Sequence, residues 1–143
     1  MNHDTAIELP VPEVDEDNAP YWSGLRERKV LIQRCEHCER LRHPAMSRCP
    51  YCSREGSTCD QLSGRGSVYS WIVVRKAFGP EFVDEVPYTV ATIDLDEGVR
   101  VVGRLEADVI DFGLRVEPMF VDHPSWVELR FAAETGVVEN TTV

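Results

Sequence analysis

Short apolar runs separated by turn residues fill the second half of the chain, and this is the pattern of consecutive β-strands. The longest run alternates between two kinds of side chain from Val68 to Lys76. An Asp-Glu-Gly turn at 96–98 separates two later runs and predicts a hairpin. Four further strands are expected, at 88–95, 99–105, 114–121 and 126–133.

The number and spacing of these strands predict a mainly β fold. Five strands between residues 63 and 135, with a long first strand and one longer connection at 106–113, match a five-stranded Greek-key barrel of the OB type. That connection has room for a helical turn. An open sandwich of the same five strands is the alternative.

A short helix is predicted ahead of the strands. Asn18 can cap it, Pro20 suits its first turn, and it is expected to end near Lys29. The helix could pack on its own domain, or its aromatic residues could dock a partner or a ligand. One side of it is apolar and carries Tyr21, Trp22 and Leu25.

Two cysteine pairs are the strongest chemical signal in the sequence. A strand expected at 30–34 runs directly into a Cys-Glu-His-Cys motif, and a Cys-Pro-Tyr-Cys motif follows after ten residues. Each pair can hold one side of a tetrahedral metal ion, and a short hairpin at 41–47 would bring the second pair back to the first. Iron would fit the same four thiolates and is the alternative metal. The predicted ligands of a structural zinc ion are Cys35, Cys38, Cys49 and Cys52.

Other roles for the cysteines fit the sequence less well. Two disulfides would need an oxidising compartment, and a redox CxxC motif normally works singly at the start of a helix. His37 and His43 lie near the motifs, but four thiolates already complete the shell, so both are expected outside it. The odd cysteine, Cys59, is expected to be a small buried residue. A closed site activates no water, so its predicted role is to stabilise the ribbon.

The charge of the chain is uneven. The net charge of −10 divides into −6 for residues 1–20, +4 for residues 21–59 and −8 for residues 60–143. An acidic surface repels a phosphate backbone, so nucleic acid is a disfavoured partner. No run approaches the roughly 18 apolar residues of a membrane span, and the N-terminus lacks a signal-peptide pattern. A cytoplasmic protein that does not enter a membrane is predicted.

These changes of composition divide the chain into four predicted parts. Residues 1–19 are acidic, contain two prolines and show no apolar period, so a flexible or loosely docked arm is expected. The helix and the metal-binding ribbon occupy residues 20–62. The OB-fold domain occupies residues 63–135, and residues 136–143 form a C-terminal tail.

No catalytic motif is recognisable in the sequence. A GxSxG elbow, a phosphate loop and an HExxH helix are absent from it. Asp122 and His123 are adjacent, but the side chains of neighbouring residues usually diverge, and a turn ahead of a proline explains both. The acidic residues of the 94–97 hairpin are expected at a solvated tip.

The order of the motifs resembles a known family. The Tyr-Trp-Ser-Gly-Leu helix at 21–25, the two cysteine motifs, the Ser-Gly-Arg-Gly-Ser turn at 63–67 and the barrel are similar to the zinc-ribbon plus OB-fold proteins associated with acyl-CoA. That family long carried only a domain-of-unknown-function label. The resemblance extends over residues 19–135 and implies a rubredoxin-like zinc ribbon followed by an OB-fold barrel.

The resemblance also implies a function. It implies a non-catalytic accessory subunit that binds a thiolase-like or hydratase-like enzyme and helps it to handle acyl-CoA, as in steroid side-chain aldolases, acyltransferases and thiolases. Zinc, an enzyme partner in a hetero-oligomer and acyl-CoA as a shared ligand follow from it, in steroid side-chain or fatty acyl-CoA metabolism. The expected contacts with the partner or with acyl-CoA are Tyr21, Trp22, Arg26, Arg34, Arg65 and Trp71.

A module that binds single-stranded nucleic acid is the alternative function, because OB folds serve both purposes. Tyr69, Trp71 and Tyr88 could stack on bases. However, residues 60–143 carry seven basic residues against fifteen acidic ones, which favours the accessory subunit. The same argument directs the phosphates of CoA to the basic ribbon or to the partner.

Overall fold

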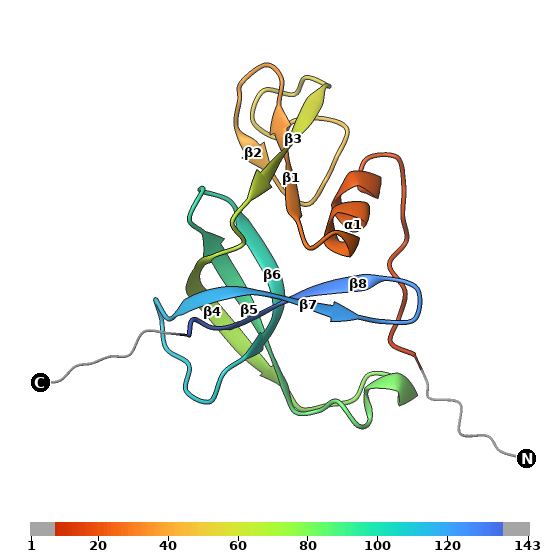
Figure 1. Ribbon diagram of the computed structural model, residues 1–143, viewed down its shortest axis with the longest axis vertical. Coiled ribbons are helices and arrows are strands. Elements are labelled where there is room, and N and C mark those ends of the chain that lie inside the picture. The colour runs from red at the N-terminus through yellow and green to blue at the C-terminus, as the bar shows by residue number, and fades with distance from the viewer. Residues whose placement is uncertain (1–7, 136–143) are drawn as a thin grey trace, which may run out of the picture.

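The computed structural model describes residues 8–135 and confirms the mainly β architecture (Figure 1). One helix, α1 (Ala19–Arg26), precedes a three-stranded sheet and a closed five-stranded barrel. Residues 1–7 of the predicted arm and the predicted tail at 136–143 lie outside the described residues. Between residues 8 and 135, no helix has the length and apolar character that crossing a bilayer requires.

The three-stranded sheet forms the ribbon and stands above the barrel in Figure 1. It consists of β1 (Val30–Cys35), β2 (Leu41–Arg42) and β3 (Ser57–Leu62), in the order β2-β1-β3 with both pairings antiparallel. The strand predicted at 30–34 is therefore confirmed. The hairpin predicted at 41–47 was wrong, because Leu41 and Arg42 pair back with β1 and residues 43–47 contain bends and no strand. Since β1 is central, the residue at its end, Cys35, is held from both sides.

The barrel is closed, which excludes the open sandwich. Its strand order is β4-β5-β6-β8-β7, with β7 returning to β4, as in an OB fold. Every strand lies within two residues of its predicted bounds. The connection after the third barrel strand forms turns and contains no helix. A 3-10 turn, η1 (Pro80–Phe82), lies in the 75–87 loop. The five strands are β4 (Gly66–Val74), β5 (Tyr88–Leu95), β6 (Arg100–Glu106), β7 (Arg115–Asp122) and β8 (Val127–Ala133).

One hydrophobic core connects the helix, the ribbon and the barrel. It includes Leu25 of α1, Val30 and Ile32 of β1, Ile93 of β5 and Phe131 of β8, and all five side chains are fully buried or nearly so. Along β5 the buried residues alternate with more exposed ones, as expected for a strand with one face toward a barrel interior. The ribbon therefore shares the core of the barrel.

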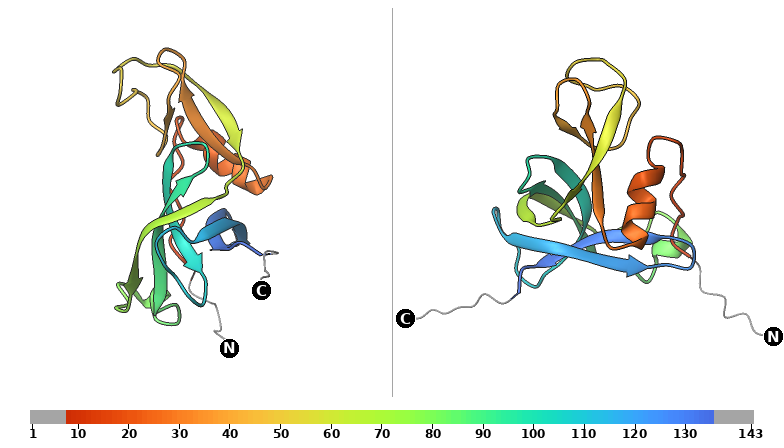
Figure 2. Two further views of the ribbon diagram at one scale, coloured as in Figure 1. Left: turned by 90° about the vertical axis from the view of Figure 1, so that its left-hand side faces the viewer. Right: turned by 45° about the horizontal axis from the view of Figure 1, so that its top comes forward.

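Polar contacts fix α1 on the tip of the β7–β8 hairpin, and Figure 2 shows the helix beside these strands. Arg28 donates from Nη2 to Asp122 Oδ2 at 2.6 Å, and Arg26 donates from Nη2 to the carbonyl oxygen of Ser125 at 2.6 Å. Arg26 is the last residue of the helix, and Arg28 lies in the turn that leads from the helix into β1. The direction in which the ribbon leaves the barrel is therefore set at this point.

The helix is shorter than predicted. Asn18 precedes it, but its side chain bonds to Asp15: Asn18 Oδ1 accepts the Asp15 N–H and Asp15 Oδ1 accepts the Asn18 N–H, both at 2.8 Å. The helix ends at Arg26 rather than near Lys29. The reason is the left-handed backbone of Arg28, with φ of 61°, which turns the chain out of the helix and into β1.

The expectation that Cys59 is buried was wrong, because its side chain is exposed. It lies on β3, which is an edge strand of the ribbon sheet with β1 as its one neighbour. Along β3 only the last residue, Leu62, is buried. The strand becomes part of the core where it approaches the barrel, and Cys59 lies before that point.

Truncation of Phe131 is expected to destabilise the barrel, because its ring is fully buried at the centre of the core. Phe131→Ala should lower the free energy of unfolding by about 3–5 kcal/mol. Urea or thermal unfolding of the full chain measures this. As the control, Val102→Ala removes a side chain that is 67% exposed on β6 and should change stability by less than about 0.5 kcal/mol. Equal losses for the two variants would contradict the assigned core.

Candidate metal centre and surrounding surface

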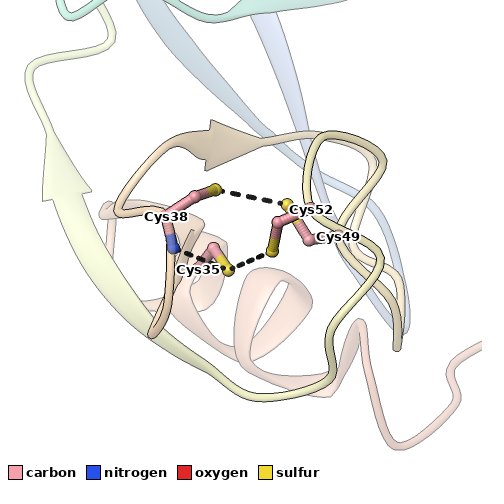
Figure 3. Close-up of side chains that lie close together, drawn as sticks. All are labelled: Cys35, Cys38, Cys49 and Cys52. Carbon is pink, nitrogen blue, oxygen red and sulfur yellow. Dashed lines mark hydrogen bonds between the residues drawn. The ribbon is translucent and has the colours of Figure 1, made fainter.

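The four predicted cysteine ligands meet at one point of the ribbon (Figure 3). Their sulfur atoms all lie within 4.8 Å of one another. Cys35 Sγ is 3.6 Å from Cys52 Sγ, and Cys38 Sγ is 3.5 Å from Cys49 Sγ. A zinc ion with four Zn–S bonds of about 2.3 Å separates its sulfurs by about 3.8 Å. The cluster therefore fits a tetrahedral metal ion bound by thiolates alone.

Both cysteine pairs are built in the same way. In each pair, the carbonyl oxygen of the first cysteine accepts a hydrogen bond from the N–H of the residue four positions later. Glu39 N–H donates to Cys35, and Ser53 N–H donates to Cys49. Glu39 and Ser53 have left-handed backbones, with φ of 62° and 65°. The tight turn closed by this hydrogen bond holds the second cysteine of the pair close to the first. The CxxC spacing and this backbone conformation together allow each motif to supply two of the four sulfur ligands.

Backbone N–H groups also point at the sulfur atoms. The N–H groups of Cys38 and His37 approach Cys35 Sγ at 3.5 and 3.3 Å and lower the pKa of its thiol. Burial raises the pKa of the Cys49 thiol, but hydrogen bonds from Tyr51 N–H and other neighbours outweigh burial and lower it to about 6. The local structure thus favours the thiolate form that binds a metal.

The Cys38 thiol shows why a cation completes the cluster. The N–H of Arg40 lowers the pKa of Cys38, but burial and the neighbouring thiols outweigh it and raise that pKa to about 11. Four sulfurs this close cannot all be anionic without a cation between them. A bound divalent ion would hold all four as thiolates and release the protons. Every coordination position is then filled by protein, so this centre has a structural role.

Both neighbouring histidines lie outside the cluster, as predicted. His37 Nε2 is 3.1 Å from the carbonyl oxygen of Glu55. His43 packs against the ring of Tyr21 at 5.1 Å between centroids, and burial lowers its pKa. Within residues 8–135, the four cysteines are the one group of three or more such side chains close enough to share a metal ion.

Tyr21 and Trp22, two of the expected partner contacts, pack within the chain. Their rings meet edge to face at 5.0 Å, and Trp22 meets Trp126 of the β7–β8 hairpin at 5.9 Å. Burial raises the pKa of Tyr21 to about 12. Both side chains pack against the core and are partly exposed to solvent. Packing of the helix explains them, and a contact with a partner stays a prediction.

The structure does not bring the six expected contact residues together. Arg34 donates to Asp60 Oδ2 at 2.6 Å, and Arg65 donates to Glu134 Oε2 at 2.9 Å. Arg26 bonds to the β7–β8 hairpin as described above, so all three arginines have partners inside the chain. Trp71 lies on β4, where it contacts Phe112. The six are spread over α1, β1, the turn before β4, and β4.

Asp122 and His123 diverge, as expected for neighbours in sequence. Asp122 binds Arg28, and that arginine lowers the pKa of its carboxyl group. His123 Nε2 is 2.8 Å from Glu128 Oε1, and its ring stacks on Trp126 at 4.4 Å. The two side chains therefore connect the hairpin tip to different elements and do not form an acid–base pair.

The acidic tip of the β5–β6 hairpin is exposed, and each of its carboxylates also has a partner. The sequence predicts the solvated tip but not these partners, which are distant in sequence or lie across the hairpin. The Glu97 contact ties the hairpin to the end of the ribbon. The three contacts are Asp94–Arg100, Asp96–Arg115 and the Ser63 N–H with Glu97 Oε2.

A cleft of about 410 Å³ lies between the ribbon and this hairpin, and the sequence did not reveal it. Arg42 and Tyr51 line it from the ribbon, and Arg100 lines it from β6. An adjoining hollow of about 440 Å³ shares Tyr51 and adds Arg34 and Arg40. Since two segments some 50 residues apart form the cleft, no local motif marks it.

Arg42 is the unusual residue of the cleft, because it is only 2% exposed and has no carboxylate partner among the described residues. Its Nε donates to Gln33 Oε1 at 2.8 Å and its Nη2 to the carbonyl oxygen of Met46 at 3.0 Å, while Nη1 has no partner there. A buried cation normally has a counterion. Polar Gln33 in an apolar strand was the available sequence signal.

Loss of the metal is expected to unfold the ribbon. Full-length protein should contain about one zinc ion per chain, and Cys49→Ser should lose it because three thiolates leave the shell open. Metal analysis together with thermal unfolding measures both effects. Cys59→Ser is the matched control, since that exposed thiol lies outside the cluster. Iron in the purified protein, or zinc retained by Cys49→Ser, would contradict the assignment.

Comparison with known proteins identifies both parts of the structure. The family model for the rubredoxin-like zinc ribbon domain of ChsH2 matches residues 22–57. The model for the C-terminal OB-fold domain of ChsH2 matches residues 60–121. These matches confirm the expected ribbon and barrel, and the first of them supports zinc as the metal.

Two relatives contain a segment that is similar to the ribbon and barrel of this chain. The chain is 37% identical over 122 residues to a probable enoyl-CoA hydratase alpha subunit of Thermomonospora curvata, covering 83% of this chain but only 36% of that relative. It is 35% identical over 104 residues to a DUF35 domain-containing scaffold protein of Methanocaldococcus jannaschii, covering 69% of this chain and 73% of the relative.

A solved structure described as an Ltp2-ChsH2(DUF35) aldolase contains a similar chain. The TM-score is 0.77 at 34% sequence identity, and the alignment covers 86% of this chain and 98% of that one. Identity above 30% over nearly the whole of the solved chain agrees with the scaffold relative and with both domain matches. The chain therefore belongs to the DUF35 family of proteins with a zinc ribbon and an OB fold.

Proposed function

We propose that the chain is a non-catalytic accessory subunit of an enzyme complex that acts on acyl-CoA. The observation that carries this proposal is the match of ribbon and barrel together to one chain of the Ltp2-ChsH2(DUF35) aldolase. The hydratase alpha subunit of Thermomonospora curvata supports the same class, since it contains a similar segment within a longer protein. A hydratase-like or thiolase-like enzyme is the proposed partner.

The chemistry of the described residues agrees with this role. The four-cysteine centre is closed, so a bound zinc ion would stabilise the ribbon and offer no site for a substrate. Asp122 and His123 serve contacts within the fold. In this proposal the reacting groups belong to the partner, and the chain supplies shape and charge beside its active site.

Acyl-CoA is the proposed shared ligand, with a steroid side chain or a fatty acid as the acyl group. The cleft between the ribbon and the β5–β6 hairpin supports contact with its phosphates from the ribbon side, where Arg42 lines the cleft and Arg40 lines the adjoining hollow. On the hairpin side, Arg100 is paired with Asp94. Arg42 there lacks an anionic partner, and Arg40 lies over the Tyr51 ring at 4.7 Å without an ion pair of its own among the described residues. A phosphate group bound at the exposed Arg40 would supply negative charge there and, through space, to the buried guanidinium of Arg42.

Co-expression tests the function. The full chain, produced with hydratase-like and thiolase-like proteins encoded beside it, should co-purify as a hetero-oligomer with about one zinc ion per copy of this chain. Native mass spectrometry and metal analysis of one sample measure both. The complex should turn over acyl-CoA, whereas the chain alone should not.

Three outcomes would contradict the proposal. They are a zinc-loaded chain that ignores both enzyme classes, turnover of acyl-CoA by the isolated chain, and retention of single-stranded nucleic acid through purification. The last would favour the alternative OB-fold module. The structure argues against it, because five of the seven basic residues after position 60 already form ion pairs.

The role of the cleft and of the adjoining hollow, which Arg40 lines, can be tested in the assembled complex. Arg40→Glu should raise KM for acyl-CoA about tenfold with kcat unchanged, as loss of one charge-assisted contact to a phosphate would do. Steady-state kinetics of the complex measures this. Arg54→Glu reverses the charge of another exposed ribbon arginine that does not line the cleft, and it should leave KM unchanged. Equal KM values for the two variants would place the phosphates elsewhere.

A further inference from the structure

Strand β4 is paired along its whole length on one side only. Toward β5 the ladder runs from Gly66 to Val74, but toward β7 it includes only Gly66 and Ser67. Two more backbone bonds connect Val68 to the segment before β7. A bulge at Tyr69 follows, and from there the strand diverges from β7. Among the described residues, no strand pairs with the second side of residues 70–74.

The side chains along this open edge are apolar. Ile72 is 63% exposed and Val73 is 43% exposed. Trp71 extends the apolar surface, because its ring contacts Phe112 at 5.0 Å between centroids, and Phe112 is itself 73% exposed. Soluble proteins usually protect a free edge with charged residues, with proline or by covering it. Between Ser70 and Val74 this edge has no charged residue and no proline, and no strand within residues 8–135 covers it, although a bulge at Tyr69 precedes it.

The charges at the end of this edge lack ion-pair partners among the described residues, although Lys76 Nζ lies 5.5 Å from the centroid of the Phe78 ring. Residues 60–143 contain seven basic residues in an acidic region of net charge −8. Five of them form ion pairs. The other two, Arg75 and Lys76, directly follow β4, are exposed and make no ion pair within residues 8–135. An acidic domain thus leaves its two uncompensated cations beside its open apolar edge.

We infer that the open edge of β4 is the docking surface for the partner enzyme, which adds an extended segment to it. This inference rests on the function proposed above. The segment carries apolar side chains against Ile72, Val73 and Trp71, and a carboxylate that meets Arg75 or Lys76. Backbone hydrogen bonds supply affinity and the side chains supply specificity, as in other cases of strand addition.

The two cations beside the open edge favour a segment of the partner enzyme over other molecules that could bind there. A second copy of this chain would bring the same apolar edge and two more cations, so its β4 edge offers no anion to Arg75 and Lys76. A nucleic acid would meet two cations beside a domain of net charge −8, and it has no peptide backbone to pair with the open edge. An extended protein segment with an acidic residue satisfies the backbone edge, the apolar side chains and the cations together.

Matched variants of the full, zinc-loaded chain test the inference. Ile72→Glu and Arg75→Glu should each raise Kd for the partner about tenfold or more, as a contact at the centre of an interface does. Val102→Glu places the same charge at an equally exposed position on β6, and Arg54→Glu reverses a charge on the ribbon. These two controls should change Kd less than about threefold. Thermal unfolding verifies that all four variants remain folded.

Hydrogen exchange of the unmodified chain provides a second test that needs no variant. Amide groups within residues 70–74 that face away from β5 should exchange freely in the isolated chain and become protected in the complex. Amides on the same strand that face β5 should change little.

The outcomes separate this inference from the function on which it rests. A complex that forms while the amides of residues 70–74 stay unprotected, or one that tolerates Ile72→Glu, overturns the docking surface and leaves the accessory role intact. Failure to form a complex with either enzyme class overturns both. A homodimer that Ile72→Glu dissociates assigns the edge to a second copy of this chain and overturns the partner enzyme as its occupant.

Discussion

Four sulfur atoms that must share one cation are the constraint on which the ribbon depends. The sheet has three strands, one of them of two residues, and too few buried side chains to fold alone. Cys35 ends β1, while Val30 and Ile32 near its other end belong to the barrel core. The metal site therefore fixes the end of a strand that begins in the core. Metal binding thus stabilises the folded state of the whole chain relative to the unfolded state.

The junction between ribbon and barrel turns this local constraint into a functional shape. Arg28 and Arg26 hold α1 on the β7–β8 hairpin, and Glu97 holds the β5–β6 hairpin to the end of β3 through the Ser63 N–H. The cleft exists because both sets of contacts hold the ribbon in one position relative to the barrel. A ribbon without its metal would lose the wall that carries Arg42, although every residue of the barrel remained in place.

Most of the fold could be predicted from local patterns in the sequence. Alternation along the chain located the five barrel strands, and the two CxxC motifs located the metal ligands, because in both cases the determining residues are close in sequence. Exposure of Cys59, the carboxylate partners at the hairpin tip and the cleft around Arg42 were missed. Each depends on which distant strand lies alongside, and a pattern of one strand does not contain its neighbour. The open edge of β4 belongs to the same class, since its sequence predicts a strand but not where pairing with β7 stops.

The two surfaces proposed for function lie at opposite ends of the β4–β5 pair. The cleft borders the β5–β6 hairpin, where Gly66 pairs with Leu95, and the open edge ends where Val74 pairs with Tyr88. Eight residues of strand separate these ends by about 25 Å. An enzyme segment added to β4 would leave the arginines of the cleft free. Partner and CoA phosphates could then be bound at the same time, with the rigid barrel fixing the distance between them.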